Sequence, residues 1–222
     1  VREVRTTHYG LFVTYFPHLV AGPVLHHAQM MPQFADPSVY RPRMSHLVAG
    51  LAIFAIGLFK KVVAADGIAP YADAVFRPVD GGAWPGLEEA WLGALAYTLQ
   101  LYFDFSGYSD MALGLAKMFG VRFPLNFNSP FKAASIIDYW ARWHMTLTRY
   151  LTTYLYYPMA MKVSRWRSRR GLPVGAAGAR TPLGFALMIG WPTLYTMGLA
   201  GVWHGAGLQF FGGAFIEPVD RK

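Results

Sequence analysis

Two histidines, each directly preceded by a tryptophan, are the residues of this chain best suited to chemistry. His144 follows Trp143 and His204 follows Trp203, both in apolar and aromatic surroundings. An imidazole accepts a proton near neutral pH, and burial favours its neutral, basic form. The Gly-Ala-Gly sequence after His204 leaves space beside the ring. His204 and His144 are therefore candidate catalytic residues, and Trp203 is a candidate substrate-binding residue. The alternative for His204 is a core histidine hydrogen-bonded to a neighbouring helix, and the alternative for His144 is an interfacial anchor beside the tryptophans and Arg142.

His144 lies in an aromatic and basic stretch, residues 138–158, that is expected to form one helix at the boundary between lipid and water. In such a helix Asp138 and Arg142 are four residues apart and can pair on one face. His144 and Thr148 have the same spacing on a neighbouring face. Asp138 and Arg142 are candidate substrate-binding residues, and the alternative is an internal ion pair that fixes the helix.

A second group of charges lies inside an apolar stretch. Asp104 and Asp110 fall in the middle of residues 87–119, where a carboxylate facing lipid would be costly. We expect both to face protein or water, and we expect a polar break of the helix at residues 104–110. Asp104 is a candidate substrate-binding residue, although helix capping or a hydrogen-bond network within the membrane explains it equally well.

Several reaction classes lack support in the sequence. The chain has no cysteine, which excludes disulfides, thiolate zinc sites and cysteine nucleophiles. It also lacks a Gly-x-Ser-x-Gly elbow, a His-Glu-x-x-His zinc motif, a Walker loop and a dinucleotide fingerprint. The adjacent His26 and His27 indicate a metal only weakly, so no metal site is expected. What remains is a membrane-embedded base that acts on a hydroxyl group.

The composition predicts an all-α membrane protein that positions these residues. Of the 222 residues, 54% are hydrophobic and 14% are charged, whereas a soluble domain is about 25% charged. Membrane spans are expected at residues 45–66 and 182–201, with the long apolar stretch 87–119 beside them. The expected re-entrant segment and loops are residues 9–22, 24–44, 67–86, 120–137 and 160–181.

The distribution of charge predicts the orientation in the membrane. Residues 160–181 carry six cations and no acid, whereas residues 67–86 are mainly acidic. Positive loops remain in the cytoplasm, so residues 160–181 are predicted to be cytoplasmic and residues 67–86 to lie on the other side. The net charge of +8 is interpreted in the same way, and nucleic-acid binding is not expected.

Three segments in the same order resemble the membrane-bound O-acyltransferase (MBOAT) family. They are LYFDFSGYSDMALGLAKMFG, NFNSPFKAASIIDYWARWHMTLTRYLTTYLYYP and GVWHGA, and the earlier TYFPHLVAGPV and LFKKVVAAD agree. The most similar branch is the bacterial alginate O-acetyltransferases and their relatives in polysaccharide acetylation. The resemblance implies a multi-helix transmembrane bundle, with re-entrant and interfacial helices, around a central tunnel.

The resemblance also implies the activity. An acyl group would pass from a cytoplasmic-side donor to an acceptor hydroxyl, with His204 as the general base and His144 on the tunnel. The donor, acetyl-CoA or an acyl-carrier intermediate, would be a substrate, and no cofactor would be bound. The implied partners are a polysaccharide acceptor, membrane lipids and other polysaccharide-acetylation proteins, and the implied location is the bacterial inner membrane, as a multi-pass protein.

Residues 1–222 would then be a partial MBOAT transmembrane domain, with further helices on both sides. Three alternatives stay open at this point. The enzyme could transfer D-alanine or another acyl group to a cell-envelope polymer such as teichoic acid. The chain could instead be a non-enzymatic transporter or channel subunit, whose histidines and aspartates form a proton or solute path. It could also be an inactive truncated remnant.

Overall fold

The computed structural model describes residues 6–19 and 22–204, together with all side chains in these ranges except those of Asp80 and His204. Every regular element in these ranges is helical, as the sequence predicts. The chain divides into two compact units, Val1–Thr146 and Leu147–Lys222, which are described separately below.

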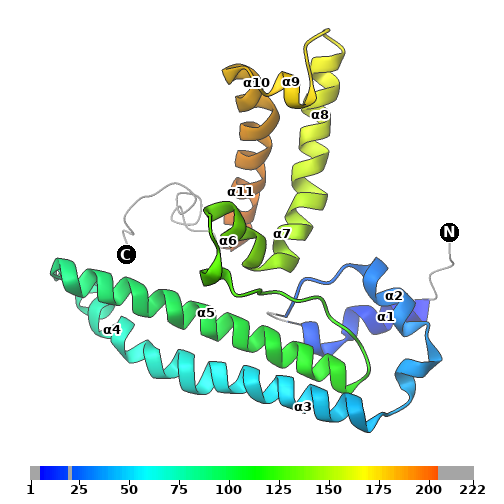
Figure 1. Cartoon of the computed structure of the whole chain (residues 1–222), viewed down its shortest axis with the longest axis vertical. Helices are drawn as coiled ribbons and strands as arrows, with labels where there is room; N and C mark the ends of the chain where they lie inside the picture. The colour runs from blue at the N-terminus through cyan, green and yellow to red at the C-terminus, as the bar shows by residue number, and fades with distance from the viewer. Residues whose placement is uncertain (1–5, 20–21, 205–222) are drawn as a thin grey trace. The chain divides into compact units, whose positions relative to one another are not determined.

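The first unit is built on two long helices that run side by side. One is continuous through α3 (Met44–Phe59), a π-helical segment (Lys60–Ala65) and α4 (Asp66–Asp80). The other is α5 (Leu87–Met118), which packs along α3, the π-helical segment and α4 (Figure 1). The connection at residues 81–86 is short, and it makes the two helices antiparallel.

Two pairs of glycines set the register of this helix pair. A Cβ on Gly50 would lie 2.6 Å from the Gly114 carbonyl oxygen, and a Cβ on Gly57 would lie 2.6 Å from that of Gly107. The glycines are seven residues apart on each helix, so both pairs lie on one face two turns apart. In lipid, small residues at such positions let backbones approach closely and gain dispersion contacts.

Ion pairs join the same two helices at the π-helical segment. Lys60 Nζ lies 2.5 Å from Asp110 Oδ2, and Lys61 Nζ lies 2.7 Å from both Asp104 Oδ1 and Asp66 Oδ1. Asp104 and Asp110 therefore neutralise lysines of the neighbouring helix within an otherwise apolar surface, and Asp66 pairs with Lys61 within the same helix.

The N-terminal part of the first unit covers the end of α5. It comprises α1 (Thr6–Thr14), a 3₁₀ turn (Phe16–His18), α2 (His27–Phe34) and a second 3₁₀ turn (Pro37–Tyr40). Tyr15, Met30 and Phe34 form a buried core with Ala116 and Val121 from the end of α5 and the residues after it. His26, which the sequence suggests weakly as a metal ligand, accepts a hydrogen bond from the Ala28 backbone N–H at 3.1 Å and caps α2.

After α5, an extended segment leads through a 3₁₀ turn (Pro130–Lys132) into α6 (Ile136–Arg142) and α7 (Met145–Leu151). The second unit continues with a π-helical segment (Thr152–Tyr156) and α8 (Tyr157–Ser168). It returns through α9 (Gly175–Gly178), α10 (Pro182–Phe185), a π-helical segment (Ala186–Gly190) and α11 (Trp191–His204), which contacts α8.

Two stretches of the described chain are long and apolar enough to cross a membrane, Met44–Val79 and Pro182–Trp203. They contain both expected spans. Only 11% and 22% of their most apolar windows are buried in the structure. This exposure differs from the core helix of a water-soluble protein, whose apolar face is covered by the protein itself.

Several predicted boundaries are wrong. Residues 24–44 contain α2 and are not simply a loop. Residues 67–80 continue the preceding helix despite two prolines, because packing against α5 compensates for the backbone bonds that proline cannot make. The expected break at residues 104–110 is absent, since α5 is continuous. Residues 160–168 are helical as the end of α8, so only the rest of the stretch up to residue 181 connects helices.

Candidate functional site

His144 lies at a sharp bend and not within a regular helix, which corrects the prediction of a single helix over residues 138–158. Its φ is +42°, in the left-handed region that non-glycine residues rarely adopt. The bend separates α6 from α7, so His144 and Thr148 do not share a helix face as expected. A backbone conformation of this kind persists only where surrounding contacts hold it.

The contacts that hold the bend come from the extended segment after α5. The Met145 backbone N–H donates to the Asn126 carbonyl at 2.8 Å, and the Asn128 N–H donates to the Arg142 carbonyl at 3.0 Å. These two hydrogen bonds flank His144 on both sides. They fix the bend to residues far upstream in the sequence.

The side chain of Asn126 is the centre of a buried polar network. Asn126 is 2% exposed. Its Oδ1 accepts hydrogen bonds from Thr146 Oγ1 at 2.8 Å and from the Thr146 backbone N–H at 3.4 Å. Its Nδ2 donates to Ser109 Oγ on α5 at 3.0 Å. Thr146 Oγ1 in turn accepts from the Val24 backbone N–H at 3.0 Å, so the network joins four segments of the first unit.

This network determines which nitrogen of His144 carries the proton. His144 Nδ1 lies 2.8 Å from Asn126 Oδ1. A backbone N–H can only donate, so the Asn126 atom that faces Thr146 N is the oxygen. His144 Nδ1 is therefore the donor, and in the neutral ring the lone pair lies on Nε2.

Aromatic rings surround the imidazole. The Phe105 ring meets His144 edge-on at 4.7 Å between centroids, and the Phe127 ring stacks on it at 6.3 Å. Trp143 contacts the Phe127 ring at 5.1 Å and stacks on Tyr139 at 5.8 Å. His144 is thus held in a half-buried aromatic setting, where Asn126 fixes its orientation.

The predicted pairing of Asp138 with Arg142 is confirmed. Arg142 Nε donates to Asp138 Oδ1 at 2.8 Å, and the Ala134 backbone N–H donates to Asp138 Oδ2 at 3.2 Å. The Arg142 guanidinium first, and the Ala134 N–H second, hold the pKa of the Asp138 carboxyl below its usual value. This geometry is that of an internal ion pair at the end of α6, the alternative that the sequence left open.

The other predicted site residues lie in different surroundings. Asp104 on α5 pairs with Lys61, within the charged cluster that joins the two long helices. Trp203 lies in the last turn of α11, with 67% of its surface exposed. His204 is the last residue of α11, and its side chain and the glycines that follow it lie outside the described residues. A role in substrate binding or catalysis stays a prediction for all three residues.

Sequence reasoning missed Asn126, Thr146 and Ser109. Asn126 belongs to a loop that sequence alone describes only as polar, and no short-range spacing connects it to His144. The signal that was present is an amide side chain flanked by apolar residues in Leu125-Asn126-Phe127. Within the described ranges no group of three or more His, Cys, Asp or Glu side chains could hold a metal ion.

A family model matches residues 4–172 of the chain, which include the long antiparallel helices and the His144 bend. Its description is "MBOAT, membrane-bound O-acyltransferase family". The chain belongs to this family of membrane-bound O-acyltransferases, as the ordered motifs predict.

Individual proteins with similar sequences are named as O-acetyltransferases or as a D-alanyltransferase. The chain is 43% identical over 202 residues to a peptidoglycan O-acetyltransferase of Helicobacter pylori, covering 91% of this chain and 34% of the relative. It is 40% identical over 203 residues to a probable alginate O-acetylase, AlgI, of Azotobacter vinelandii, covering 91% of this chain and 35% of the relative. A teichoic acid D-alanyltransferase of Bacillus subtilis is 26% identical over 201 residues, covering 90% of this chain and 46% of the relative. The chain spans about a third of the length of the first two relatives.

Proposed function

We propose that this chain is part of an O-acyltransferase of the bacterial inner membrane, which it crosses several times, and that the enzyme transfers acetyl groups to hydroxyls of an exported polysaccharide. The observation that carries the proposal is family membership over residues 4–172, with relatives of about 40% identity whose names specify O-acetyl transfer to alginate or peptidoglycan. The exposed apolar helices support a membrane location.

In the proposed mechanism the neutral imidazole of His204 removes the proton of the acceptor hydroxyl. The oxygen attacks the carbonyl carbon of the donor thioester, which is acetyl-CoA or an acyl-carrier intermediate. The tetrahedral intermediate then expels the thiolate, and the imidazolium returns the proton to it. No bound cofactor is required. The acceptor polymer, the donor, lipid and other acetylation proteins are the proposed partners.

His144 is proposed to line the tunnel through the bundle. The hydrogen bond to Asn126 and the aromatic rings around the imidazole support this role, because they hold the ring in a fixed orientation. We further propose that Trp203 and Asp104 contact substrate. The ion pair formed by Asp138 and Arg142 would shape the bend before His144.

The test of this mechanism is the variant His204→Ala in the full-length protein. Loss of a general base is expected to lower acetyl transfer to the polymer by about 10²–10⁴-fold. The matched control is His27→Ala, which makes the same substitution at an exposed histidine of α2. Membrane abundance of both variants is measured by immunoblotting. Normal transfer by the His204 variant, at normal abundance, would remove His204 from the mechanism.

D-alanyl transfer is the second candidate, because the teichoic acid D-alanyltransferase matches 90% of the chain. Radiolabelled acetyl and D-alanyl donors supplied to membranes containing the protein separate the two. We expect label in the cell-envelope polymer from the acetyl donor, and incorporation only from the D-alanyl donor would reverse the assignment.

A further inference from the structure

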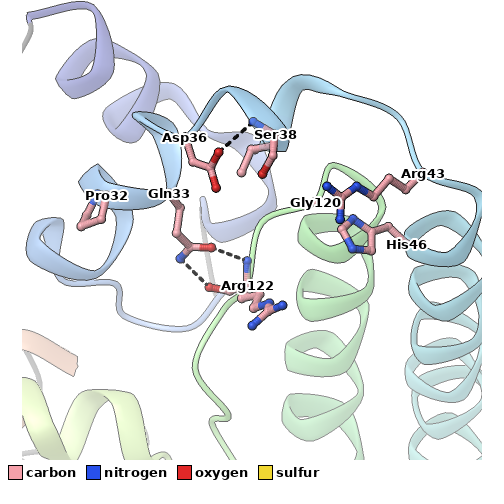
Figure 2. A pocket seen from close by; sticks show the side chains of 9 residues that line it. Pro32, Gln33, Asp36, Ser38, Arg43, His46, Gly120 and Arg122 are labelled. Carbon is pink, nitrogen blue, oxygen red and sulfur yellow. Dashed lines mark hydrogen bonds between the residues drawn. The ribbon is translucent and has the colours of Figure 1, made fainter.

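A cavity of about 430 Å³ lies at the start of α3, outside the His144 site. Its walls come from the end of α2, the following 3₁₀ turn, the first turn of α3 and the residues after α5 (Figure 2). The polar residues that matter are Asp36, Ser38, Arg43, His46 and Arg122. All of these elements belong to the first unit.

The cavity has an excess of positive charge. Arg43 and Arg122 form none of the ion pairs that the structure contains within residues 6–19 and 22–204. Lys117, like these two arginines, lies close enough to His46 for its charge to act on the imidazole. Two arginines and one carboxylate, that of Asp36, thus line the cavity, and a third cation lies near His46.

That carboxylate is already engaged. Asp36 Oδ1 accepts the Ser38 backbone N–H at 2.8 Å and caps the 3₁₀ turn. The hydrogen bonds from Ser38, together with the charge of Arg43, keep the pKa of Asp36 below its usual value. Asp36 is therefore engaged as a turn cap, and among the described residues it forms no ion pair with Arg43 or Arg122.

The backbone adds to the positive character. Arg43 is the residue before the first turn of α3, and it provides no side-chain hydrogen bond to that turn. The first N–H groups of the helix therefore lack a side-chain cap at the edge of the cavity. The N-terminus of a helix favours negative charge and presents N–H donors to it.

The wall opposite α3 is fixed in place. Gln33 Nε2 donates to the Arg122 carbonyl at 3.0 Å, and the Arg122 N–H donates to Gln33 Oε1 at 2.8 Å, as Figure 2 shows. Gly120 ends α5 with φ +78°, and a Cβ there would lie 3.4 Å from His46 Nδ1. The backbone of Arg122 is thus held at the cavity by α2, and Gly120 lets the chain pass close to His46.

We propose that this cavity is a binding site for a phosphate group at the boundary between membrane and water. The planar fork of arginine matches phosphate oxygens, and two arginines line this cavity beside a helix start without a side-chain cap. The cavity lies at the beginning of an apolar helix long enough to span the bilayer, the depth at which lipid phosphates lie. The phosphate would come from the headgroup of an anionic phospholipid or from a soluble phosphate compound.

The test uses the full-length protein purified in a neutral detergent. Native mass spectrometry compares retention of phosphatidylglycerol with that of phosphatidylcholine, and a second arm measures the rise in unfolding temperature with inorganic pyrophosphate. Each variant, Arg43→Gln and Arg122→Gln, is expected to weaken binding about tenfold, since one charged hydrogen-bonding group is lost. The control is Arg41→Gln, an exposed arginine that does not line the cavity.

The double variant carries both Arg43→Gln and Arg122→Gln. A preference for phosphatidylglycerol that is lost in the double variant and kept in Arg41→Gln supports a lipid headgroup site. Stabilisation by pyrophosphate with the same variant pattern, and without lipid preference, supports a soluble ligand. Binding of neither probe, or equal binding by the double variant, overturns the site. Arg43 is exposed and precedes α3, so Arg43→Gln alone decides the test if the double variant does not fold.

Discussion

At the scale of single residues, Asn126 gives the sharpest prediction. Its side chain satisfies His144, Thr146 and Ser109 at once. The variant Asn126→Ala removes the hydrogen bonds to all three side chains and should lower the free energy of unfolding by about 1–3 kcal/mol. Chemical denaturation of the purified protein measures this change.

A matched control lies two residues away. Asn128→Ala removes the same amide from an exposed residue whose hydrogen bonds with Arg142 use its backbone N–H and carbonyl, so stability should hardly change. If His144 acts in transfer, Asn126→Asp should restore activity better than Asn126→Ala, because a carboxylate still accepts from Nδ1. Equal activity of both variants would limit Asn126 to a structural role.

The residue scale also separates what sequence can predict from what it cannot. The pairing of Asp138 with Arg142 follows from a spacing of four residues within one short helix, and it is confirmed. The partner of His144 comes from a segment 18 residues upstream, and the backbone at His144 adopts a left-handed conformation. Neither fact has a local sequence pattern, because tertiary contacts decide both.

At the scale of elements, the glycine pairs control the distance between α3 and α5. Gly57→Ala would place a methyl group against the Gly107 carbonyl and push the two helices apart. We expect this overpacking to lower the free energy of unfolding by about 1–3 kcal/mol. The unfolding temperature of the detergent-solubilised protein reports the change.

The control is Gly67→Ala in α4, where a Cβ would meet no atom within 4 Å. There the substitution should raise the free energy of unfolding by about 0.5–1 kcal/mol, because alanine loses less backbone entropy in a helix. Destabilisation by both substitutions would contradict the assignment of close packing to Gly57.

The elements show why a helix break was expected at residues 104–110 and does not occur. Read along one segment, Asp104 and Asp110 are isolated acids in an apolar stretch. In the folded protein they meet Lys61 and Lys60, which read along their own segment are equally anomalous. The acids of one helix neutralise the lysines of the other. A prediction that considers one segment at a time does not detect this pairing.

At the scale of the whole molecule, the charge at the two ends of the first unit predicts its orientation. Arg41, Arg43, Lys117 and Arg122 lie at the end where α3 begins and α5 finishes. Glu88 and Glu89 begin α5 at the opposite end. Positive residues remain in the cytoplasm, so the end with the arginines should be cytoplasmic and residues 81–86 should lie outside.

The absence of native cysteine makes this orientation measurable with single introduced thiols. Ala83→Cys should react with a membrane-impermeant maleimide in intact cells. Ala35→Cys and Ser168→Cys, at exposed positions, should react only after the membrane is opened. Labelling of Ser168→Cys from outside would contradict the predicted cytoplasmic location of the basic residues 160–181.

The sequence therefore predicts the class, the membrane spans and the family of this molecule, because these depend on composition and ordered motifs. It does not predict the continuous helix through Pro70 and Pro78, which depends on the neighbouring α5. The central tunnel implied by the resemblance, and the domain extent over residues 1–222, stay predictions.

The π-helical segment Ala186–Gly190 has a geometric consequence for the chemistry proposed at the end of α11. The Trp191 N–H donates to the Ala186 carbonyl, five residues back, and Pro192 follows at once. One extra residue in a helical turn rotates everything after it by about 100° relative to everything before it. The direction in which the final turn of α11 faces therefore depends on this wide turn. Deleting one residue from the π-helical segment would rotate residues 203 and 204 about the helix axis without changing either residue.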